Sequence, residues 1–286
     1  MIKTYLRCAL IWGILVLNPP PATGSFSAAR ITTLMNLKYN CDMHNRQYMH
    51  GGQNVSWNFA PYMALLYLPD DLNECRCGGS LVTRNFILTA AHCLEMCPRK
   101  HELKVCLGAS QITSPSSCMK NFGIEQRFVH EEFSWSEQIN DIALLKLDGL
   151  VDNRGPILPV CLPVDSRMHS FTSFPGQPYF AYGWGTTELG THSKSLQEIM
   201  VNNRPCAYHT DGMFFCTTSR IVDSCRGDSG GPVVSQSTQF GIISHGNYAC
   251  GMQGGAFNTN VSLFMPWIMD KLQNYPDYNY RDFSES

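Results

Sequence analysis

Three short runs of the sequence carry the residue types that acyl transfer to a serine requires. They read TAAHC around His92, NDIALL around Asp141 and GDSGGP around Ser229, in that order along the chain. The reaction needs a hydroxyl at a glycine-flanked turn, an imidazole to take its proton, a carboxylate to fix the imidazole tautomer, and backbone N–H groups for the oxyanion. A core histidine, a turn aspartate or a glycine-rich bend would each explain one run alone. The three together predict a serine nucleophile at Ser229.

The remainder of the chain predicts mostly β-strands to position these runs. Short β-branched and aromatic segments, separated by clusters of glycine, proline, asparagine and serine, indicate an all-β sandwich or barrel. The clearest of these segments are 62–66, 86–88, 142–145, 180–182 and 240–243. Only Leu263–Tyr275 predicts a helix, because its apolar residues are spaced to share one face, namely Phe264, Trp267, Ile268 and Leu272.

From Met49 to about Tyr275 the chain resembles the trypsin-like (chymotrypsin-fold) family of serine proteases, through the three runs and their order. The run GWG at 183–185 matches the family's loop beside the activation pocket. The resemblance implies two six-stranded antiparallel β-barrels with a C-terminal α-helix. In style the catalytic part is similar to secreted arthropod immune or haemolymph-type proteases. One cysteine in the expected propeptide, Cys41, is too few for the six-cysteine clip module found in many of them.

The same resemblance implies a catalytic role for each run. His92 would act as general base and then as general acid, Asp141 would orient it, and Ser229 would be the nucleophile. The backbone N–H groups of Gly227 and Ser229 would form the oxyanion hole. His92 and Asp141 would come from the first barrel and Ser229 from the second, with the active site in the cleft between them. We therefore expect a serine endopeptidase that works through an acyl-enzyme.

The resemblance also implies cleavage after basic residues. Asp223 stands six residues before Ser229, where an acid in the family lies at the floor of the primary specificity pocket. A buried carboxylate without a partner would attract a substrate Arg or Lys, whereas a solvated loop aspartate would not. Other residues expected to contact substrate are Ser244, His245, Gly246 and Ala256.

Two of these positions depart from the family pattern. His245 stands where the family commonly has tryptophan, so a smaller, titratable imidazole should weaken hydrophobic selection, unless it is merely an exposed cleft residue. The glycine of the far pocket wall falls on Gly255 or on Ala256, depending on the length assigned to the preceding loop. An alanine methyl group there would crowd Arg or Lys and slow turnover.

Activation is expected at an unusual junction. In the family, cleavage frees an apolar N-terminus whose ammonium pairs with the aspartate before the serine, here Asp228. Alignment of the glycines that follow puts Met49 at this N-terminus and Tyr48 before the cut bond. A trypsin-like activator would instead cut after Arg46, two residues early. The choice between these cuts stays open, as does a precursor that is never properly activated.

The N-terminal residues predict secretion to the extracellular space. A basic start precedes an apolar run over 8–17, followed by prolines and then small residues. The apolar run is shorter than the roughly 20 residues that a membrane-spanning helix needs. We expect a signal peptide over 1–24, a propeptide over 25–48, the protease domain over 49–275 and a C-terminal tail over 276–286.

Thirteen cysteines fit an oxidising compartment, because Cys8 would leave with the signal peptide and the remaining residues can pair. The resemblance implies four disulfides, of which the last would tether the propeptide: Cys77–Cys93, Cys206–Cys216, Cys225–Cys250 and Cys41–Cys161. Four other cysteines allow three pairings, and the sequence favours none of them: Cys75, Cys97, Cys106 and Cys118.

Charge and composition favour no other class of partner. The formal net charge is −2 and 15% of residues are charged, which predicts no binding of nucleic acid, and no later segment is apolar enough to span a membrane. We expect no cofactor and no metal, since neither a zinc knuckle nor an acidic calcium loop occurs. Two sequons, at Asn54 and Asn260, suit a secreted glycoprotein.

The expected partners are protein or peptide substrates, an activating protease and serpin-type inhibitors, and we expect a monomer. The competing hypothesis is a protease-like binding or cofactor protein that keeps the three catalytic residues but does not order its oxyanion hole. A disulfide-rich structural module would leave the ordered runs unexplained.

Overall fold

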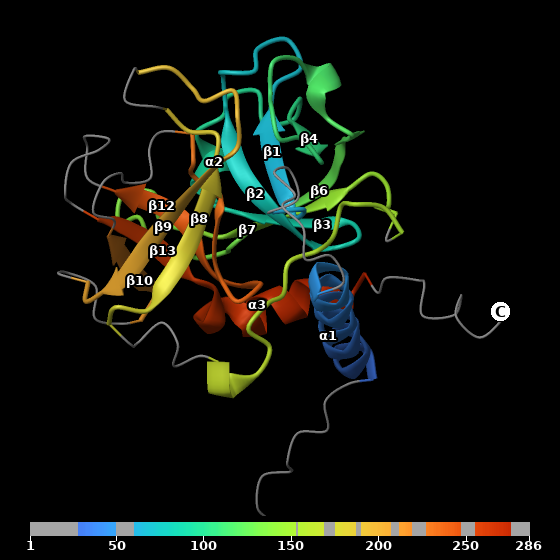
Figure 1. The fold of residues 1–286 in the computed structure, drawn as a ribbon, viewed down its shortest axis with the longest axis vertical. Helices are drawn as coiled ribbons and strands as arrows, with labels where there is room; N and C mark the ends of the chain where they lie inside the picture. The colour runs from blue at the N-terminus through green and yellow to red at the C-terminus, as the bar shows by residue number, and fades with distance from the viewer. Residues whose placement is uncertain are drawn as a thin grey trace, which may run out of the picture.

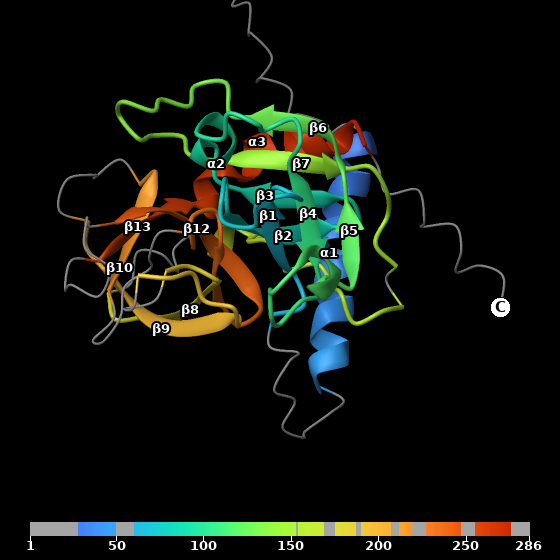
Figure 2. The same ribbon diagram turned by 90° about the horizontal axis from the view of Figure 1, so that it is seen from above.

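The computed structural model describes residues 28–49, 60–152, 154–168, 175–186, 190–206, 212–218, 227–246 and 255–275. In this part of the chain the strands form two antiparallel sheets that lie side by side, with few helices (Figures 1 and 2). The predicted all-β class is therefore confirmed.

The first sheet has the strand order β5-β4-β1-β2-β3-β7-β6. Its strands are β1 (Met63–Tyr67), β2 (Cys77–Thr83), β3 (Phe86–Thr89), β4 (Lys104–Leu107), β5 (Lys120–Phe122), β6 (Ile124–Val129) and β7 (Ala143–Leu147). Strands β1, β2 and β3, at the centre of this sheet, are buried along their whole length.

This sheet has seven strands where the resemblance implied six, because Gly123 interrupts one segment. The residues before it, β5, pair with β4, and the residues after it, β6, pair with β7. Gly123 donates its N–H to Asp148 Oδ1 at 2.9 Å, and a Cβ on this glycine would collide with the same carboxylate. The two edges of the sheet are thus consecutive in the chain, and the sheet curls into a half-barrel.

The second sheet is a closed six-stranded barrel with the order β10-β13-β12-β11-β8-β9. Its strands are β8 (Pro178–Gly183), β9 (Gln197–Arg204), β10 (Phe214–Thr218), β11 (Pro232–Ser235), β12 (Thr238–Gly246) and β13 (Ala256–Asn260). Tyr179 packs against Phe215 and Phe240 in its core, with ring centroids 5.2 and 5.9 Å away.

The two sheets approach each other closely at β2. A Cβ on Gly78 would collide with the backbone of Gly231, which precedes β11. Ser80 Oγ donates a hydrogen bond to Gln239 Oε1 of β12 at 2.5 Å. This contact fixes the turn before β11, which carries Ser229, against the first sheet.

The C-terminal helix α3 (Val261–Gln273) confirms the helix predicted from the apolar spacing. Asn260 caps it by accepting a hydrogen bond from Ser262 N at 3.2 Å. Phe264, Ile268 and Leu272 are buried, as one shared face requires. Two other short helices are α2 (His92–Glu95) and the 3₁₀ helix η1 (Pro115–Ser117).

Helix α1 (Ala28–Met49) was not predicted, because its segment has no continuous apolar stripe. It packs beside α3 (Figure 1), and its buried side chains, among those described, are Thr33 and Leu37. The Cys41–Cys161 disulfide attaches it to the loop before β8. Tertiary contacts rather than an amphipathic pattern therefore hold this helix. No helix in the described residues is long and apolar enough to cross a membrane.

The disulfides of the structure decide the pairing that the sequence left open. Cys75 bonds to Cys97 and Cys106 bonds to Cys118. Three pairs implied by the resemblance are also present, Cys41–Cys161, Cys77–Cys93 and Cys206–Cys216. The expected Cys225–Cys250 pair lies outside the described residues.

Candidate active site

His92 and Asp141 meet because β3 and β7 are neighbours. Thr89, which ends β3, pairs with Ala143, which begins β7, so the residues just beyond these strand ends face each other. His92 Nδ1 lies 2.7 Å from Asp141 Oδ2, and the backbone N–H of His92 donates to Asp141 Oδ1 at 2.9 Å. One carboxylate therefore fixes both the ring and the backbone of the histidine.

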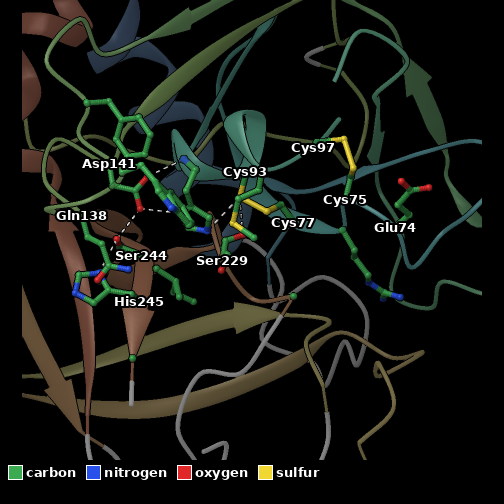
Figure 3. Close-up of a pocket in the computed structure, with 18 of the residues that line it drawn as sticks. Glu74, Cys75, Cys77, Cys93, Cys97, Gln138, Asp141, Ser229, Ser244 and His245 are labelled. Carbon is green, nitrogen blue, oxygen red and sulfur yellow. Dashed lines mark hydrogen bonds and ion pairs between the residues drawn. A yellow bond between two sulfur atoms is a disulfide. The ribbon is translucent and has the colours of Figure 1, made fainter. Parts of the chain in front are cut away.

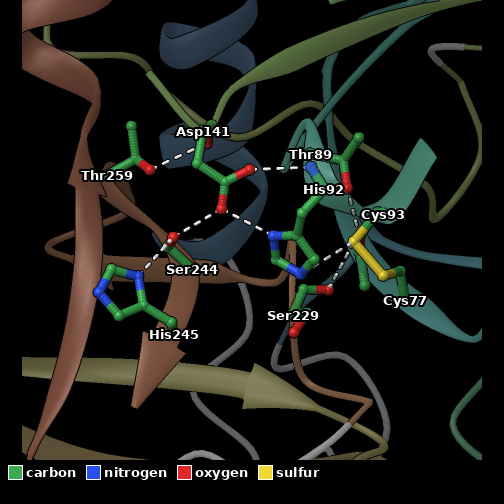
Figure 4. A network of polar contacts seen from close by, with 10 residues as sticks. Cys77, Thr89, His92, Cys93, Asp141, Ser229, Ser244, His245 and Thr259 are labelled. Carbon is green, nitrogen blue, oxygen red and sulfur yellow. Dashed lines mark hydrogen bonds and ion pairs between the residues drawn. A yellow bond between two sulfur atoms is a disulfide. The ribbon is translucent and has the colours of Figure 1, made fainter. Parts of the chain in front are cut away.

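Asp141 lies in an environment that keeps it ionised despite its 2% exposure. Ser244 Oγ donates to Oδ2 at 2.5 Å, and Thr259 Oγ1 donates to the backbone carbonyl of Asp141 at 2.9 Å (Figure 4). Burial raises the pKa of Asp141, but the hydrogen bonds from His92 and Ser244 outweigh burial and hold this pKa below its usual value. The ionised carboxylate keeps the proton of His92 on Nδ1, which leaves Nε2 to accept one.

Ser229 lies in a tight turn between the two sheets. Gly227 and Gly230 have φ values of 97° and 79°, a backbone region that residues other than glycine rarely adopt. The carbonyl of Ser229 accepts a hydrogen bond from Gly78 N at 2.7 Å, which ties the turn to β2. A Cβ on Gly230 would collide with the Thr89 side chain, so this turn requires glycine for space as well.

Figure 4 shows Ser229 beside the imidazole of His92. In the part of the chain that the structure describes, no hydrogen bond joins the Ser229 hydroxyl to His92 Nε2. His92 Nε2 lies 3.8 Å from Cys93 Sγ. Cys77, His92 and Cys93 bring three potential metal-ligand atoms within 4.8 Å, but both sulfurs are joined in one disulfide and offer no thiolate.

Asp228, expected to bind the new N-terminus, is buried against the GWG run. Its Oδ1 accepts a hydrogen bond from Gly185 N at 2.7 Å. A Cβ on Gly183 or Gly185 would collide with the carboxylate, which explains why both positions require glycine. Met49, whose ammonium was expected to pair with Asp228, is the last residue of α1, and in this uncut chain its nitrogen is part of a peptide bond.

One cleft joins the expected catalytic and substrate-binding residues (Figure 3). His92, Asp141 and Trp135 line it from the first sheet, while Gly227, Ser229 and the run Ser244–Gly246 line it from the second. Its far end is formed by Glu74, Arg76 and the Cys75–Cys97 disulfide.

The structure adds cleft residues that the sequence analysis missed. The Trp135 side chain is 53% exposed, and its ring centroid lies 6.2 Å from that of His92. Arg76 is buried and donates from Nη2 to the carbonyl of Ser193 at 3.0 Å. Burial lowers the pKa of Arg76, and the negative charge of Asp228 opposes that change. Neither residue belongs to a recognisable motif, so only the fold could place them here.

The expected specificity residues are only partly described. Asp223 lies outside the described residues, as does the sequon residue Asn54. Ala256 begins β13 and pairs with Gly246, but neither it nor Gly255 is among the described residues that line the cleft. Gly255 has a φ of 79°, and a Cβ there would collide with the Arg204 guanidinium. The second sequon residue, Asn260, caps α3 and donates from Nδ2 to Gly212 O at 2.9 Å.

Comparisons with known proteins agree with this arrangement. A family model described as Trypsin matches residues 49–268. "Serine protease grass" of Drosophila melanogaster is 31% identical over 267 residues, which cover 82% of this chain and 70% of that protein. "Granzyme B" of Homo sapiens is 32% identical over 236 residues, covering 79% and 91%. The structure titled "Human heparin binding protein" matches with a TM-score of 0.66 at 26% identity, covering 79% of this chain and 97% of that one.

Proposed function

Because the chain belongs to the trypsin family of serine proteases and is a serine-type endopeptidase, we propose that His92, Asp141 and Ser229 are its catalytic triad. The observation that supports this most strongly is the two-point contact of Asp141 with His92 in the cleft that also holds Ser229. In this proposal the protein is a secreted precursor that, once cut, hydrolyses peptide bonds after Arg or Lys.

The proposed reaction uses the tautomer that Asp141 imposes. His92 Nε2 takes the proton of the Ser229 hydroxyl as Oγ attacks the substrate carbonyl, and Asp141 stabilises the resulting imidazolium. The N–H groups of Gly227 and Ser229 bind the oxyanion. The imidazolium then protonates the leaving amine, the C–N bond breaks, and an ester to Ser229 remains. Water, deprotonated by His92, cleaves this ester and restores the hydroxyl.

The proposed preference for Arg or Lys rests on Asp223 and the family resemblance. We expect Asp223→Asn to lower kcat/KM for substrates cut after Arg or Lys by at least a hundredfold, since a charge-assisted hydrogen bond to the substrate is lost. Substrates with an apolar residue at the same position serve as the control, and their rates should not fall. Equal loss for both classes would contradict the assignment.

The proposed activation rests on the surroundings of Asp228 in the uncut chain. Its carboxylate contacts a backbone N–H of the GWG run, and a mobile ammonium could replace this contact. We propose cleavage after Tyr48, which would place the Met49 ammonium on Asp228, order the oxyanion hole and bring the Ser229 hydroxyl to His92 Nε2. Residues 25–48 would stay attached through Cys41–Cys161. We also propose that another protease makes this cut and that serpin-type inhibitors bind the active enzyme. The protein would be a monomer, with glycans on Asn54 and Asn260.

The experiment that tests the proposed function pairs N-terminal sequencing with peptide hydrolysis. After reduction of the disulfides, the catalytic chain of protein from the secreting organism should begin at Met49, and the unreduced protein should cleave peptides after Arg or Lys. Ser229→Ala should remove this activity. A secreted chain that stays uncut or begins at Gln47, and that hydrolyses nothing, would contradict the proposal in favour of a binding role.

A further inference from the structure

Four polar side chains form a continuous hydrogen-bonded chain across the cleft, from His245 through Ser244 and Asp141 to His92 (Figure 4). Ser244 Oγ lies 2.5 Å from Asp141 Oδ2 and 3.0 Å from His245 Nδ1. His92 Nδ1 lies 2.7 Å from the same Oδ2. We propose that His245 is a positioning residue that acts through the Ser244 hydroxyl on Asp141 and so tunes His92 as a base. The proposal rests on the catalytic roles proposed above.

The direction of each hydrogen bond in this chain follows from counting protons. An ionised carboxylate only accepts, and a hydroxyl has one proton to donate. Ser244 therefore donates to Asp141 and must accept from His245, so Nδ1 of His245 carries a proton. The same argument assigns Nδ1–H to His92. Both imidazoles thus direct an N–H toward one carboxylate, one directly and one through a hydroxyl.

The ring of His245 is held so that Nδ1 keeps facing Ser244. It stacks on Phe257 with ring centroids 4.7 Å apart and planes 10° from parallel. Phe214 contacts it edge to face at 5.3 Å. The β12–β13 pairing shifts register between Ile243 and His245, so Ser244 is an inserted residue in the ladder. Such a bulge redirects side chains, and here it turns the Ser244 hydroxyl toward Asp141.

The protonation state of His245 Nε2 changes the strength of this chain. A cationic imidazole is a stronger donor than a neutral one, so it polarises the Ser244 hydroxyl and draws negative charge from Asp141. Asp141 then stabilises the His92 imidazolium less. The added positive charge also opposes protonation of His92 directly. His92 is therefore a better base when His245 is neutral, and the acidic limb of the activity profile contains two ionisations.

Among the described residues, few titratable groups face His245. The strands packed against its ring, β10 and β13, present Phe214 and Phe257, which do not titrate in this range. Asp141 is the charge that reaches it through Ser244, and His92 lies beyond. The other titratable side chains described along the cleft are Glu74, Arg76 and His192.

Two substitutions distinguish the proposed positioning role of the His245 N–H from the packing role of its ring. His245→Phe keeps a ring against Phe257 but removes the Nδ1 donor, and His245→Asn keeps an N–H close to the position of Nδ1 without a titrating atom. For the full chain after its activating cut, we expect His245→Phe to lower kcat about threefold to tenfold. His245→Asn should restore most of kcat, and both variants should show one ionisation on the acidic limb. A changed KM with an unaltered kcat and pH profile in both variants would overturn the proposal.

A spectroscopic measurement on the unsubstituted protein makes the test independent of activity and of how the variants fold. The proton between His92 Nδ1 and Asp141 should give a far-downfield NMR signal whose position moves in two steps as pH falls. One step belongs to His92 itself and the other to His245, and His245→Asn should lack the second. A single step in the unsubstituted protein would overturn the proposal. Absence of hydrolysis with two steps present would count against the proposed function alone.

Discussion

Asp141 holds His92 at two points, with Oδ2 2.7 Å from the ring Nδ1 and Oδ1 accepting the backbone N–H at 2.9 Å. The register of β3 and β7 creates this arrangement, since Thr89 and Ala143 are directly opposite each other. The backbone contact fixes where α2 begins, and the ring contact fixes the tautomer. The position of His92 and the placement of its proton thus depend on one buried carboxylate.

Replacing this carboxylate with an amide should leave the fold intact and remove most activity. In Asp141→Asn the amide can donate to His92 Nδ1, which favours the wrong tautomer, and we expect kcat to fall about ten-thousandfold. Steady-state hydrolysis of a peptide substrate measures this. The matched control, Asp165→Asn, changes an aspartate outside the cleft and should keep full activity. A loss below tenfold for Asp141→Asn would contradict its proposed role.

Gly185→Ala should destabilise the protein, because its Cβ would enter the space of the Asp228 carboxylate. Either the carboxylate or the GWG run must move, and the hydrogen bond from Gly185 N to Asp228 would be strained. We expect a loss of about 1–3 kcal/mol in the free energy of unfolding, measured in urea. Gly155→Ala is the control, since its Cβ would meet only Asp152 O at 3.4 Å. Equal stability of the two variants would show that the carboxylate tolerates a methyl group there.

Glu131 should stabilise the protein in a pH-dependent way. Lys271 Nζ donates to Oε1 at 2.5 Å and Trp267 Nε1 donates to Oε2 at 2.8 Å, which ties the segment before Asp141 to α3. The Lys271 hydrogen bond is the largest cause that lowers the pKa of Glu131 to about 2. A pKa lower in the folded than in the unfolded state adds stability that is complete above about pH 4.5 and is lost as pH falls toward 2.

Glu131→Gln should therefore lower the melting temperature at neutral pH and have little effect near pH 2. The carboxylate is 60% exposed, so we expect at most about 1 kcal/mol at neutral pH. Thermal unfolding followed across this pH range measures the difference, with Glu137→Gln as the control. If the difference in melting temperature between Glu131→Gln and the unsubstituted protein does not shrink as the pH falls, the proposed pH dependence is ruled out.

The Cys41–Cys161 disulfide should keep helix α1 on the protein after the proposed cut. The cut protein should have one mass without reductant and release the 25–48 segment when reduced. Cys41→Ser should release this segment on cutting alone, as seen by mass spectrometry without reductant. Ser116→Ala, a change in the 3₁₀ helix η1 and far from α1 in the sequence, should behave like the unsubstituted chain. Retention of the segment by Cys41→Ser would mean that its packing on α3 suffices.

The sequence predicted the all-β class and singled out the runs around His92, Asp141 and Ser229, because both depend on local patterns. Glycines around Ser229 and short apolar segments between turn residues are visible without a fold. It did not predict helix α1, whose stability comes from α3 and a disulfide between residues 120 positions apart. Nor could it choose between the pairings of Cys75, because Cys97, Cys106 and Cys118 were all possible partners and no local pattern distinguishes them.

The bond from His245 to Ser244 was also beyond sequence reasoning. The sequence identified His245 as a departure at the substrate wall, but its contact with Asp141 through Ser244 depends on a bulge between β12 and β13. Trp135 and Arg76 line the cleft as well, and no sequence motif predicts their positions. Residue types and local motifs can thus be recognised in the sequence, whereas the contacts that each side chain makes can be identified only from the fold.

Covalent labelling tests the central claim most directly. After cleavage before Met49, a fluorophosphonate should react with one residue per chain, and mass spectrometry of the digested protein should place the adduct on Ser229. Ser229→Ala should abolish labelling, and Asp141→Asn should slow it strongly. Labelling of a different residue, or labelling that survives Ser229→Ala, would contradict the assignment of Ser229 as the nucleophile.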